Sequence, residues 1–137
     1  MKVVRKGESQ PMVGPETAFI GSVEIHPIIH APAPARVGSS HVHFSAGART
    51  HWHSHPLGQT LHVVSGNGFV QWRDGPRYQI QEGDSVWIGP DEVHSHGAAP
   101  SGPMCHIAIT ERAEDGNASF YGPVIDEEYL PIFSAEQ

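Results

Sequence analysis

Apolar and polar residues alternate in short runs along most of this chain. Clear examples are HVHF at 41–44, RTHWHSH at 49–55, QTLHVV at 59–64, FVQW at 69–72 and PMCHIAIT at 103–110. A period of two places successive side chains on opposite faces of a β-strand. Further strand candidates are TAFIGSVEI at 17–25, which we expect to end before Pro27, RYQI at 77–80, SVWI at 85–88 and VHSH at 93–96.

Glycine and proline separate these runs. SGNG at 65–68 predicts a turn, and Asp74-Gly75 predicts a tight hairpin between the runs 69–72 and 77–80. The proline-rich segment 31–40 is expected to be an extended connection. About eight strands with close turns and no helical periodicity favour an all-β fold, either an antiparallel sandwich or a small barrel.

The end of the chain has a different pattern. Ile125, Glu128 and Tyr129 stand at helical spacing, so we expect a short C-terminal helix that Pro131 ends. A chain of 137 residues suits one domain. We therefore expect a single domain over 1–137, with a barrel core at about 17–110 and an acidic C-terminal extension at 111–137.

Charge and cysteine content exclude several classes of protein. The net charge is -7, and residues 111–137 carry 7 acidic and 1 basic side chains against 8 and 7 in residues 1–110. Without a basic patch, nucleic acid is not an expected partner. No apolar run approaches the ~18 residues of a membrane span, and no signal-peptide pattern is present. The single cysteine, Cys105, excludes a disulfide scaffold and favours a reducing compartment, so we expect a cytoplasmic protein.

Histidine is the residue type that suggests chemistry. The chain has 11 histidines, and six of them lie between His41 and His62. His53 and His55 share one face of a strand, and Gln59 follows them after a turn. His94 lies in a second histidine-rich stretch. Imidazoles from one strand with two further donors suit a first-row divalent metal ion.

The spacing of these residues resembles a known family. Gly47, His53-x-His55, Gln59 and Gly66 follow the first cupin motif, with glutamine in the glutamate position. GDSVWIGPDEVHSHGA at 83–98 resembles the second cupin motif, which it matches at Gly83 and His94. It departs from that motif at Gly89, Asp91 and Ala98. The resemblance implies a jelly-roll antiparallel β-barrel.

A closer match is to a bacterial subgroup of single-domain manganese cupins that includes hydroxynitrile lyases. The match rests on the segments GARTHWHSHPLGQTL, HSHGAAP, HPIIHAPAPA and DEEY. This chain departs from the subgroup at His51 and Thr110, and both residues are expected to line or border the pocket. The resemblance implies one divalent ion, with Mn preferred and Fe, Ni, Zn or Co as alternatives. It also implies a homodimer or homotetramer. The implied ligands are His53, His55, Gln59 and His94.

Gln59 changes the charge of such a site. An amide oxygen cancels none of the ion's charge, so four neutral ligands leave the full +2, which favours Lewis-acid chemistry over oxidation of the metal. The alternative is that Gln59 only orients a histidine.

Three residues are candidates for proton transfer or substrate binding. His96 lies two positions after His94 and therefore on the same face of a strand. It is expected in the same cavity as a general base that the metal keeps neutral. His106 lies on the last strand and is expected to reach this pocket, and Thr50 is expected to donate a hydrogen bond near its mouth. For His96 and His106, the alternative is a hydrogen-bonded core histidine.

The remaining histidines and the cysteine are assigned no chemistry. His41 and His43 alternate with apolar residues and are expected to face outward, and His62 is expected on the outer face. His51 lies at the entrance or on the surface. Cys105 has no evident base beside it, so we do not expect it to be a nucleophile.

Three functions remain open. The first is a metal-dependent lyase that makes or breaks a C–C bond in a small hydroxy or carbonyl compound such as a cyanohydrin, where the cyanohydrin rests on the resemblance alone. The second is an Fe(II) dioxygenase acting on small aromatic or diketone substrates. The third is a non-catalytic metal-binding or sensor protein.

Overall fold

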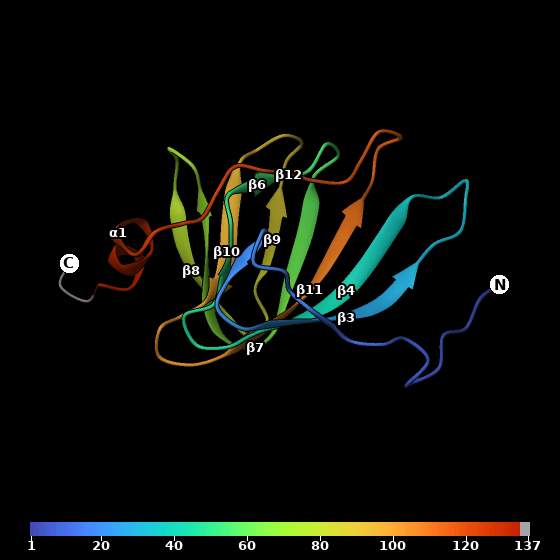
Figure 1. Ribbon diagram of the computed structural model, residues 1–137, viewed down its shortest axis with the longest axis horizontal. Coiled ribbons are helices and arrows are strands. Elements are labelled where there is room, and N and C mark those ends of the chain that lie inside the picture. The colour runs from blue at the N-terminus through green and yellow to red at the C-terminus, as the bar shows by residue number, and fades with distance from the viewer. Residues whose placement is uncertain (135–137) are drawn as a thin grey trace.

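The computed structural model describes residues 1–134 of the chain, and strands dominate it (Figure 1). The strands are β1 (Met12–Val13), β2 (Phe19–Ile20), β3 (Val23–His30), β4 (Val37–Phe44), β5 (Arg49–Thr50), β6 (His53–Ser54), β7 (Gln59–Trp72), β8 (Arg77–Gln81), β9 (Ser85–Ile88), β10 (His94–Ala98), β11 (Met104–Glu111) and β12 (Ser119–Phe120). Two short helices follow, α1 (Asp126–Tyr129) and the 3₁₀ helix η1 (Leu130–Phe133).

The strands form one curled antiparallel sheet with the order β1-β3-β4-β11-β7-β10-β5-β2. β7 joins its two halves, because residues 59–66 pair with β9 and β11 whereas residues 67–72 pair with β8 and β10. The sheet curls so that these halves face each other, as Figure 1 shows. The all-β fold with a short C-terminal helix is confirmed.

The turn predicted at SGNG is wrong. β7 runs through residues 65–68 without reversing, and Gly66 adopts a φ of 79° that few other residues tolerate. A Cβ at Gly66 would collide with the carbonyl oxygen of Pro103, and one at Gly68 would collide with that of Gly97. These glycines therefore let β7 bend while its neighbours approach closely. The hairpin at Asp74-Gly75 is confirmed, since Gln71 of β7 pairs with Arg77 of β8.

Two other strand boundaries differ from the prediction. The run 17–25 is split into β2 and β3, and β3 continues through Pro27 to His30. A register shift between Pro27 and Ile29 accommodates the proline, which has no N–H to donate to β4. The run 49–55 is likewise divided into β5 and β6. Sequence alternation does not reveal such breaks because the polarity pattern continues across them.

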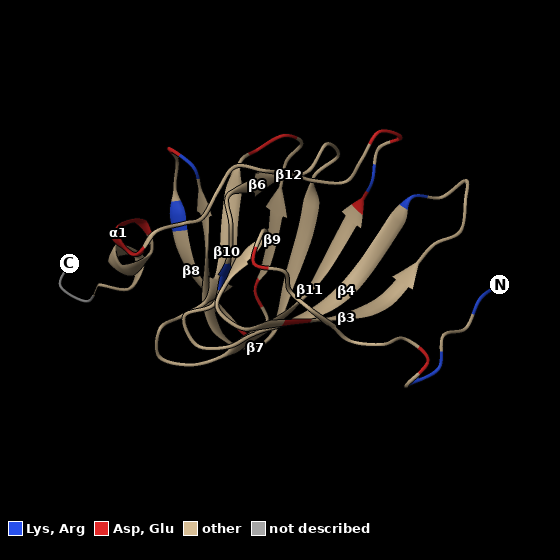
Figure 2. Ribbon diagram, in the orientation of Figure 1, with Lys and Arg blue, Asp and Glu red and all other residues tan. Residues whose placement is uncertain are grey.

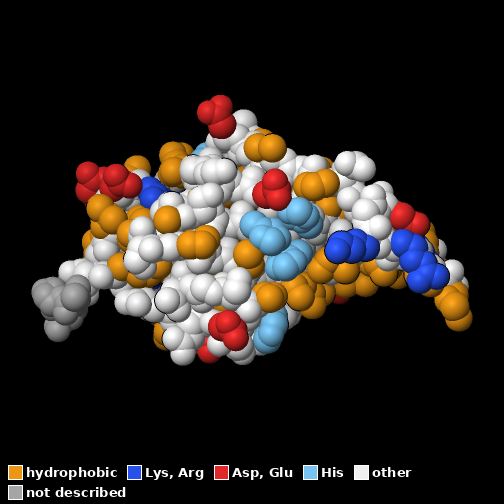
Figure 3. Space-filling model, turned by 90° about the horizontal axis from the view of Figure 1, so that it is seen from below, with side chains coloured by type: hydrophobic (Ala, Val, Ile, Leu, Met, Phe, Trp, Pro, Cys, Tyr) orange, Lys and Arg blue, Asp and Glu red, His pale blue; other side chains and the backbone are white. Residues whose placement is uncertain are grey.

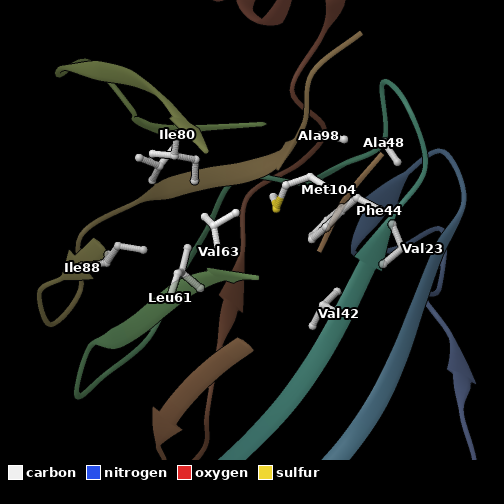
Figure 4. Packing of buried hydrophobic residues seen from close by; sticks show 11 residues of the cluster. Val23, Val42, Phe44, Ala48, Leu61, Val63, Ile80, Ile88, Ala98 and Met104 are labelled. Carbon is white, nitrogen blue, oxygen red and sulfur yellow. The ribbon is translucent and has the colours of Figure 1, made fainter. Parts of the chain in front are cut away.

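The main core lies between the two halves of the curled sheet. Figure 4 shows its apolar side chains, including Val42 and Phe44 from β4, Leu61 and Val63 from β7, and Met104 from β11. Each of these five side chains is less than 10% exposed. Because side chains alternate along a strand, His41, His43 and Cys105 are directed to the opposite, outer face. The strand face on which a histidine lies therefore decides whether its ring is directed into the core or outward.

The acidic C-terminal extension covers the outer side of the other half of the sheet. Tyr129 of α1 donates a hydrogen bond to the carbonyl of Ala98 (2.7 Å) and packs against Phe69. The buried guanidinium of Arg49 lies 4.1 Å from the centre of the Tyr129 ring and pairs with Asp126 (2.9 Å). We expected Pro131 to end the helix; α1 ends at Tyr129, but Pro131 is accommodated in the first turn of η1. Residues 135–137 of the predicted extension lie outside the described residues.

Charged residues lie mostly in the connecting loops and near the chain ends, away from the centre of the sheet (Figure 2). In the part of the chain that the structure describes, no helix has the length and apolar character needed to cross a membrane.

Candidate metal centre

Several histidines meet inside the curled sheet. His53 of β6 pairs directly with His94 of β10, and His96 lies two residues further along the same face of β10. The nearest ring nitrogens of His53, His94 and His96 all lie within 4.8 Å of one another. All three side chains are at most 4% exposed. The structure thus brings His96, the predicted base, as close to the group as two of the predicted ligands.

His55 and Gln59 complete the group. The ring centroids of His55 and His53 are 5.0 Å apart, and those of His55 and His94 are 5.6 Å apart. The turn at 56–58, with Gly58 at a φ of 84°, then leads to Gln59 at the start of β7, and this amide contacts His55. The four predicted ligands therefore share one buried region, although the tightest set of ligand atoms contains His96 in place of His55.

Three of the imidazoles are held in the same way. In each, the Nδ1 position forms a hydrogen bond with a backbone carbonyl, which can only accept, so the proton resides on Nδ1 and the lone pair on Nε2. The carbonyl partners are His51 for His53 (2.9 Å), Asn117 for His55 (2.8 Å) and Glu92 for His94 (2.8 Å). Metal-binding histidines are commonly fixed by such partners.

Gln59 is oriented by an equivalent contact. Its Nε2 amide donates to the Thr110 hydroxyl (3.0 Å), which lies opposite it in the β7–β11 register. The amide oxygen Oε1 is therefore directed away from Thr110, and it is buried without a hydrogen-bond partner. Thr110, which was expected to line or border the pocket, sets which end of this amide is free.

The group contains several buried atoms without a hydrogen-bond partner among the described residues. They are Nε2 of His55, His94 and His96 and Oε1 of Gln59. An unsatisfied buried polar atom costs about 1–3 kcal/mol. Oε1 of Gln59 and Nε2 of His55 and His94 offer lone pairs that one cation satisfies together, so the residues present fit a divalent ion.

His96 is held differently from the other three histidines. Its Nδ1 lies 3.0 Å from Nε2 of His106, which is fully buried on β11. An imidazole can donate or accept, so the shared proton can reside on either ring. Nε2 of His96 can accordingly present either a lone pair or a proton to the cavity. His106 reaches the site only through His96.

Thr50 supports the strand that carries two of the histidines of the site. Instead of lying at the mouth of the pocket, as expected, it is 3% exposed beneath β10. Its hydroxyl donates to Ser95 Oγ (3.1 Å) and accepts the backbone N–H of His96 (3.2 Å). Ser95 in turn donates to the Thr50 carbonyl (2.9 Å). These contacts fix the backbone that carries His94 and His96.

Burial keeps the imidazoles uncharged. Desolvation is the largest cause of the lowered pKa of His53, His55 and His96, and neighbouring histidines lower the pKa of His53 and His96 further. Burial also lowers the pKa of His94 and of His106 to about 4. Neutral imidazoles are the ligating and proton-accepting form, so the site is ready for both roles at neutral pH without a metal to depress these values.

A cavity of about 230 Å³ reaches Gln59 and Thr110. Ile25, Val42 and Ala108 form apolar parts of its wall, and Arg36 and Arg112 also line it. An apolar cavity of roughly 150 Å³ holds a benzene molecule. This cavity therefore has room for a small substituted ring next to the candidate ligands.

The outer residues follow the predicted orientation with one correction. His41 and His43 face outward and are half-buried, and His62 is exposed. The statement that Cys105 has no base beside it is wrong, because its Sγ lies 3.0 Å from Nδ1 of His43. Cross-strand pairing of Cys105 with His43 causes this contact, and a single sequence does not give that register.

The residues that orient the side chains of the site were harder to predict than the candidate ligands themselves. Asn117 contributes a backbone carbonyl, which no side-chain pattern signals. Ser95 was visible in the sequence only as the residue between two histidines. Thr110 has the same strand parity as His106 on β11, so the sequence could have suggested a role for it. The sequence could not have shown which residue its hydroxyl contacts.

Known proteins resemble this chain in sequence and in fold. A model of the cupin domain matches residues 40–110. A protein of Granulicella tundricola named (R)-mandelonitrile lyase is 45% identical over 129 residues, covering 94% of this chain and 98% of the relative. The crystal structure of a cupin-like protein from Thermotoga maritima has a TM-score of 0.84 at 36% identity and covers both chains fully. A polyketide cyclase from Streptomyces resistomycificus, at 16% identity, has a TM-score of 0.73 over 93% of this chain and 89% of its own.

Proposed function

Because this chain belongs to the cupin family, we propose that it is a metal-dependent lyase that cleaves or forms the C–C bond of a small cyanohydrin. The proposal rests on one observation above others, which is the set of buried lone-pair atoms on His55, Gln59, His94 and His96 that have no partner among the described residues. The 45% identity to a relative named (R)-mandelonitrile lyase suggests the reaction.

In this proposal, His53, His55, Gln59 and His94 hold one divalent ion, preferably Mn(II). The ion would supply a Lewis acid for the substrate oxygen, with its full +2 charge because all four ligands are neutral. The carbonyl contacts of the three histidines and the Thr110 contact of Gln59 favour this set. Each of these four side chains already presents one fixed lone pair.

His96 is the proposed base because its own partner is another imidazole. During cleavage, Nε2 of His96 accepts the hydroxyl proton of the cyanohydrin while His106 accepts the proton on Nδ1 of His96, 3.0 Å away. The C–O bond becomes a carbonyl, the bond to the nitrile carbon breaks, and cyanide leaves with the electron pair. The proton then passes to cyanide, so the products are an aldehyde and hydrogen cyanide. Synthesis is the same sequence in reverse.

The 230 Å³ cavity is the proposed position of the substrate's side group. Ile25, Val42 and Ala108 in its wall suit an aromatic ring or a short alkyl group, whereas Gln59 and the two lining arginines offer polar contacts. The site therefore selects for a compact molecule with its hydroxyl next to the candidate metal ligands.

The test combines metal content with turnover. Protein is stripped of metal, reloaded with Mn(II) and assayed for the release of benzaldehyde and cyanide from mandelonitrile. We expect turnover only in the reloaded protein. His96→Ala should retain the ion and lose at least 100-fold in kcat, in line with general-base contributions. His62→Ala, on the outer face, is the matched control and should behave like wild type.

Two outcomes would contradict the proposal. Turnover that is equal with and without the ion would remove the metal from the reaction. Absence of turnover in a fully loaded protein, together with metal-dependent oxygen uptake in the presence of phenols or diketones after loading with Fe(II), would favour a dioxygenase instead.

A further inference from the structure

A second group of potential metal ligands lies on the outer face of the same sheet. His41 and His43 of β4 and Cys105 of β11 place a ring nitrogen or the sulfur within 4.8 Å of one another. We call these three residues the outer cluster. Figure 3 shows histidine side chains gathered at the surface on one side of the molecule. The outer cluster shares no residue with the candidate metal centre inside the sheet.

Strand register creates the outer cluster. Cys105 lies opposite His43 across the β4–β11 pair, and His26 of β3 lies opposite His41 across the β3–β4 pair. Directly opposed residues have Cβ atoms about 4.5–5.5 Å apart. The ring centroids of His41 and His43 are 4.4 Å apart, and those of His26 and His43 are 4.6 Å apart. Three adjacent strands thus bring three imidazoles and a thiol to one patch.

The donor atoms of the outer cluster are available. Nε2 of His41 is buried and has no hydrogen-bond partner among the described residues. Cys105 Sγ and His43 Nδ1 contact each other at 3.0 Å. His26 is the adjacent fourth imidazole, and its Nε2 contacts Glu24 at 2.5 Å.

We propose that the outer cluster is a second metal site, for a thiophilic transition-metal ion of the Zn(II) type. His41, His43 and Cys105 are the ligands, and His26 is placed to provide a fourth. Zn–N bonds of about 2.0–2.1 Å and a Zn–S bond of about 2.3 Å put tetrahedral ligand atoms roughly 3.5 Å apart. The three ligand atoms lie within 4.8 Å of one another, and Cys105 Sγ is 3.0 Å from His43 Nδ1. On binding, the Cys105 thiol loses its proton to solvent and the thiolate ligates the ion.

The outer cluster differs in donor chemistry from the candidate centre inside the sheet. A thiolate with imidazoles selects Zn(II) or copper, whereas imidazoles with an amide oxygen also suit Mn(II). The candidate centre lies inside the curled sheet and the outer cluster lies on the outer face of β4 and β11, so one ion cannot contact both. Each site can therefore be removed without touching the other's ligands.

Cobalt(II) tests the proposal with a spectroscopic signature. A thiolate bound to Co(II) gives a near-ultraviolet charge-transfer band that nitrogen and oxygen ligands do not give. Titration of the metal-free protein should produce this band and saturate at one thiolate-bound ion per chain. Cys105→Ser should abolish the band and reduce total binding by one ion. His62→Ala, also on the outer face but outside the outer cluster, should retain both.

A second measurement does not depend on the cysteine variant. Cys105 is the only cysteine of the chain, so alkylation by iodoacetamide reports on it alone. Zn(II) at saturation should slow this alkylation at least tenfold in wild type, and His43→Ala should lose the protection. No thiolate band in wild type, or an unchanged rate of alkylation with Zn(II), would overturn the proposal. His53→Ala should keep both signals, since it changes only the inner group.

Discussion

The inside and the outer face of the curled sheet carry two groups of histidines that differ in how their rings are held. Inside, His53, His55 and His94 are fixed by backbone carbonyls and shielded from water. Outside, His41 and His43 are half-buried and contact other side chains, including Cys105. A carbonyl in the backbone fixes a tautomer and a direction, whereas a neighbouring side chain can rotate or exchange protons. Cys105 and His106 are adjacent on β11, yet Cys105 contacts His43 outside the sheet and His106 contacts His96 inside it.

Removal of an inner ligand should have the largest effect. His53→Ala deletes one of the fixed Nε2 donors and should abolish retention of the inner ion, and with it any turnover. Metal analysis after dialysis and the cyanohydrin assay check this. If His62→Ala on the outer face loses this ion instead, our assignment of the two faces is wrong.

Acid should destabilise the metal-free protein mainly through its buried histidines. His94 and His106 have a pKa of about 4 in the folded protein against 6.5 in the unfolded chain, so the unfolded chain binds more protons below 6.5. Stability of the metal-free protein should be constant above about pH 7 and fall from pH 6.5 toward pH 4. Each group contributes up to roughly 3 kcal/mol to this loss. Urea unfolding at a series of pH values measures it.

The contribution of His106 to this acid-induced loss of stability can be measured separately. His106→Gln removes the titration on β11, so its loss of stability between pH 6.5 and 4 should be smaller than that of wild type. An equal loss in the two proteins would mean that other groups cause it.

Neighbouring residues of β4 should differ in their effect on stability. Phe44→Ala empties a side chain that is 1% exposed and packs against the rings of His96 and His106, so we expect a loss of about 3–5 kcal/mol. His43→Ala on the outer face should change stability by only about 0.5 kcal/mol. Thermal and urea unfolding of the metal-free variants compare them. Equal losses would contradict the assignment of the two faces.

A smaller effect on metal binding than that of His53→Ala is expected from the residue that orients the amide ligand. Thr110→Val keeps the shape of the side chain but removes the hydroxyl oxygen that accepts a hydrogen bond from Gln59 Nε2 (3.0 Å). We expect metal affinity to fall by about 10–100-fold, the usual effect of losing a contact behind a metal ligand. Thr110→Ser keeps the hydroxyl and should bind the metal almost as wild type does. Equal affinity in Thr110→Val and wild type would mean that Gln59 is not a ligand.

The sequence allowed prediction of the elements that depend on local pattern. The alternation in residues 41–44 and 103–110, the Asp74-Gly75 hairpin and the spacing from His53 to Gln59 all depend on near neighbours. Positions set by strand pairing were not predictable, as the missed contact between Cys105 and His43 illustrates. Gly66 was misread because a glycine that relieves a close strand crossing looks the same in sequence as one that makes a turn. The expected homo-oligomer, cytoplasmic location and choice of manganese stay predictions.

The hydrogen bond from His55 to the carbonyl of Asn117 spans 62 positions of the chain. During synthesis, His55 leaves the ribosome long before its anchor has been translated. Selection of the tautomer at His55 must therefore wait until nearly the whole polypeptide has emerged. An ion held by Nε2 of His55 would accordingly reach its full affinity only after the segment that carries Asn117 is in place.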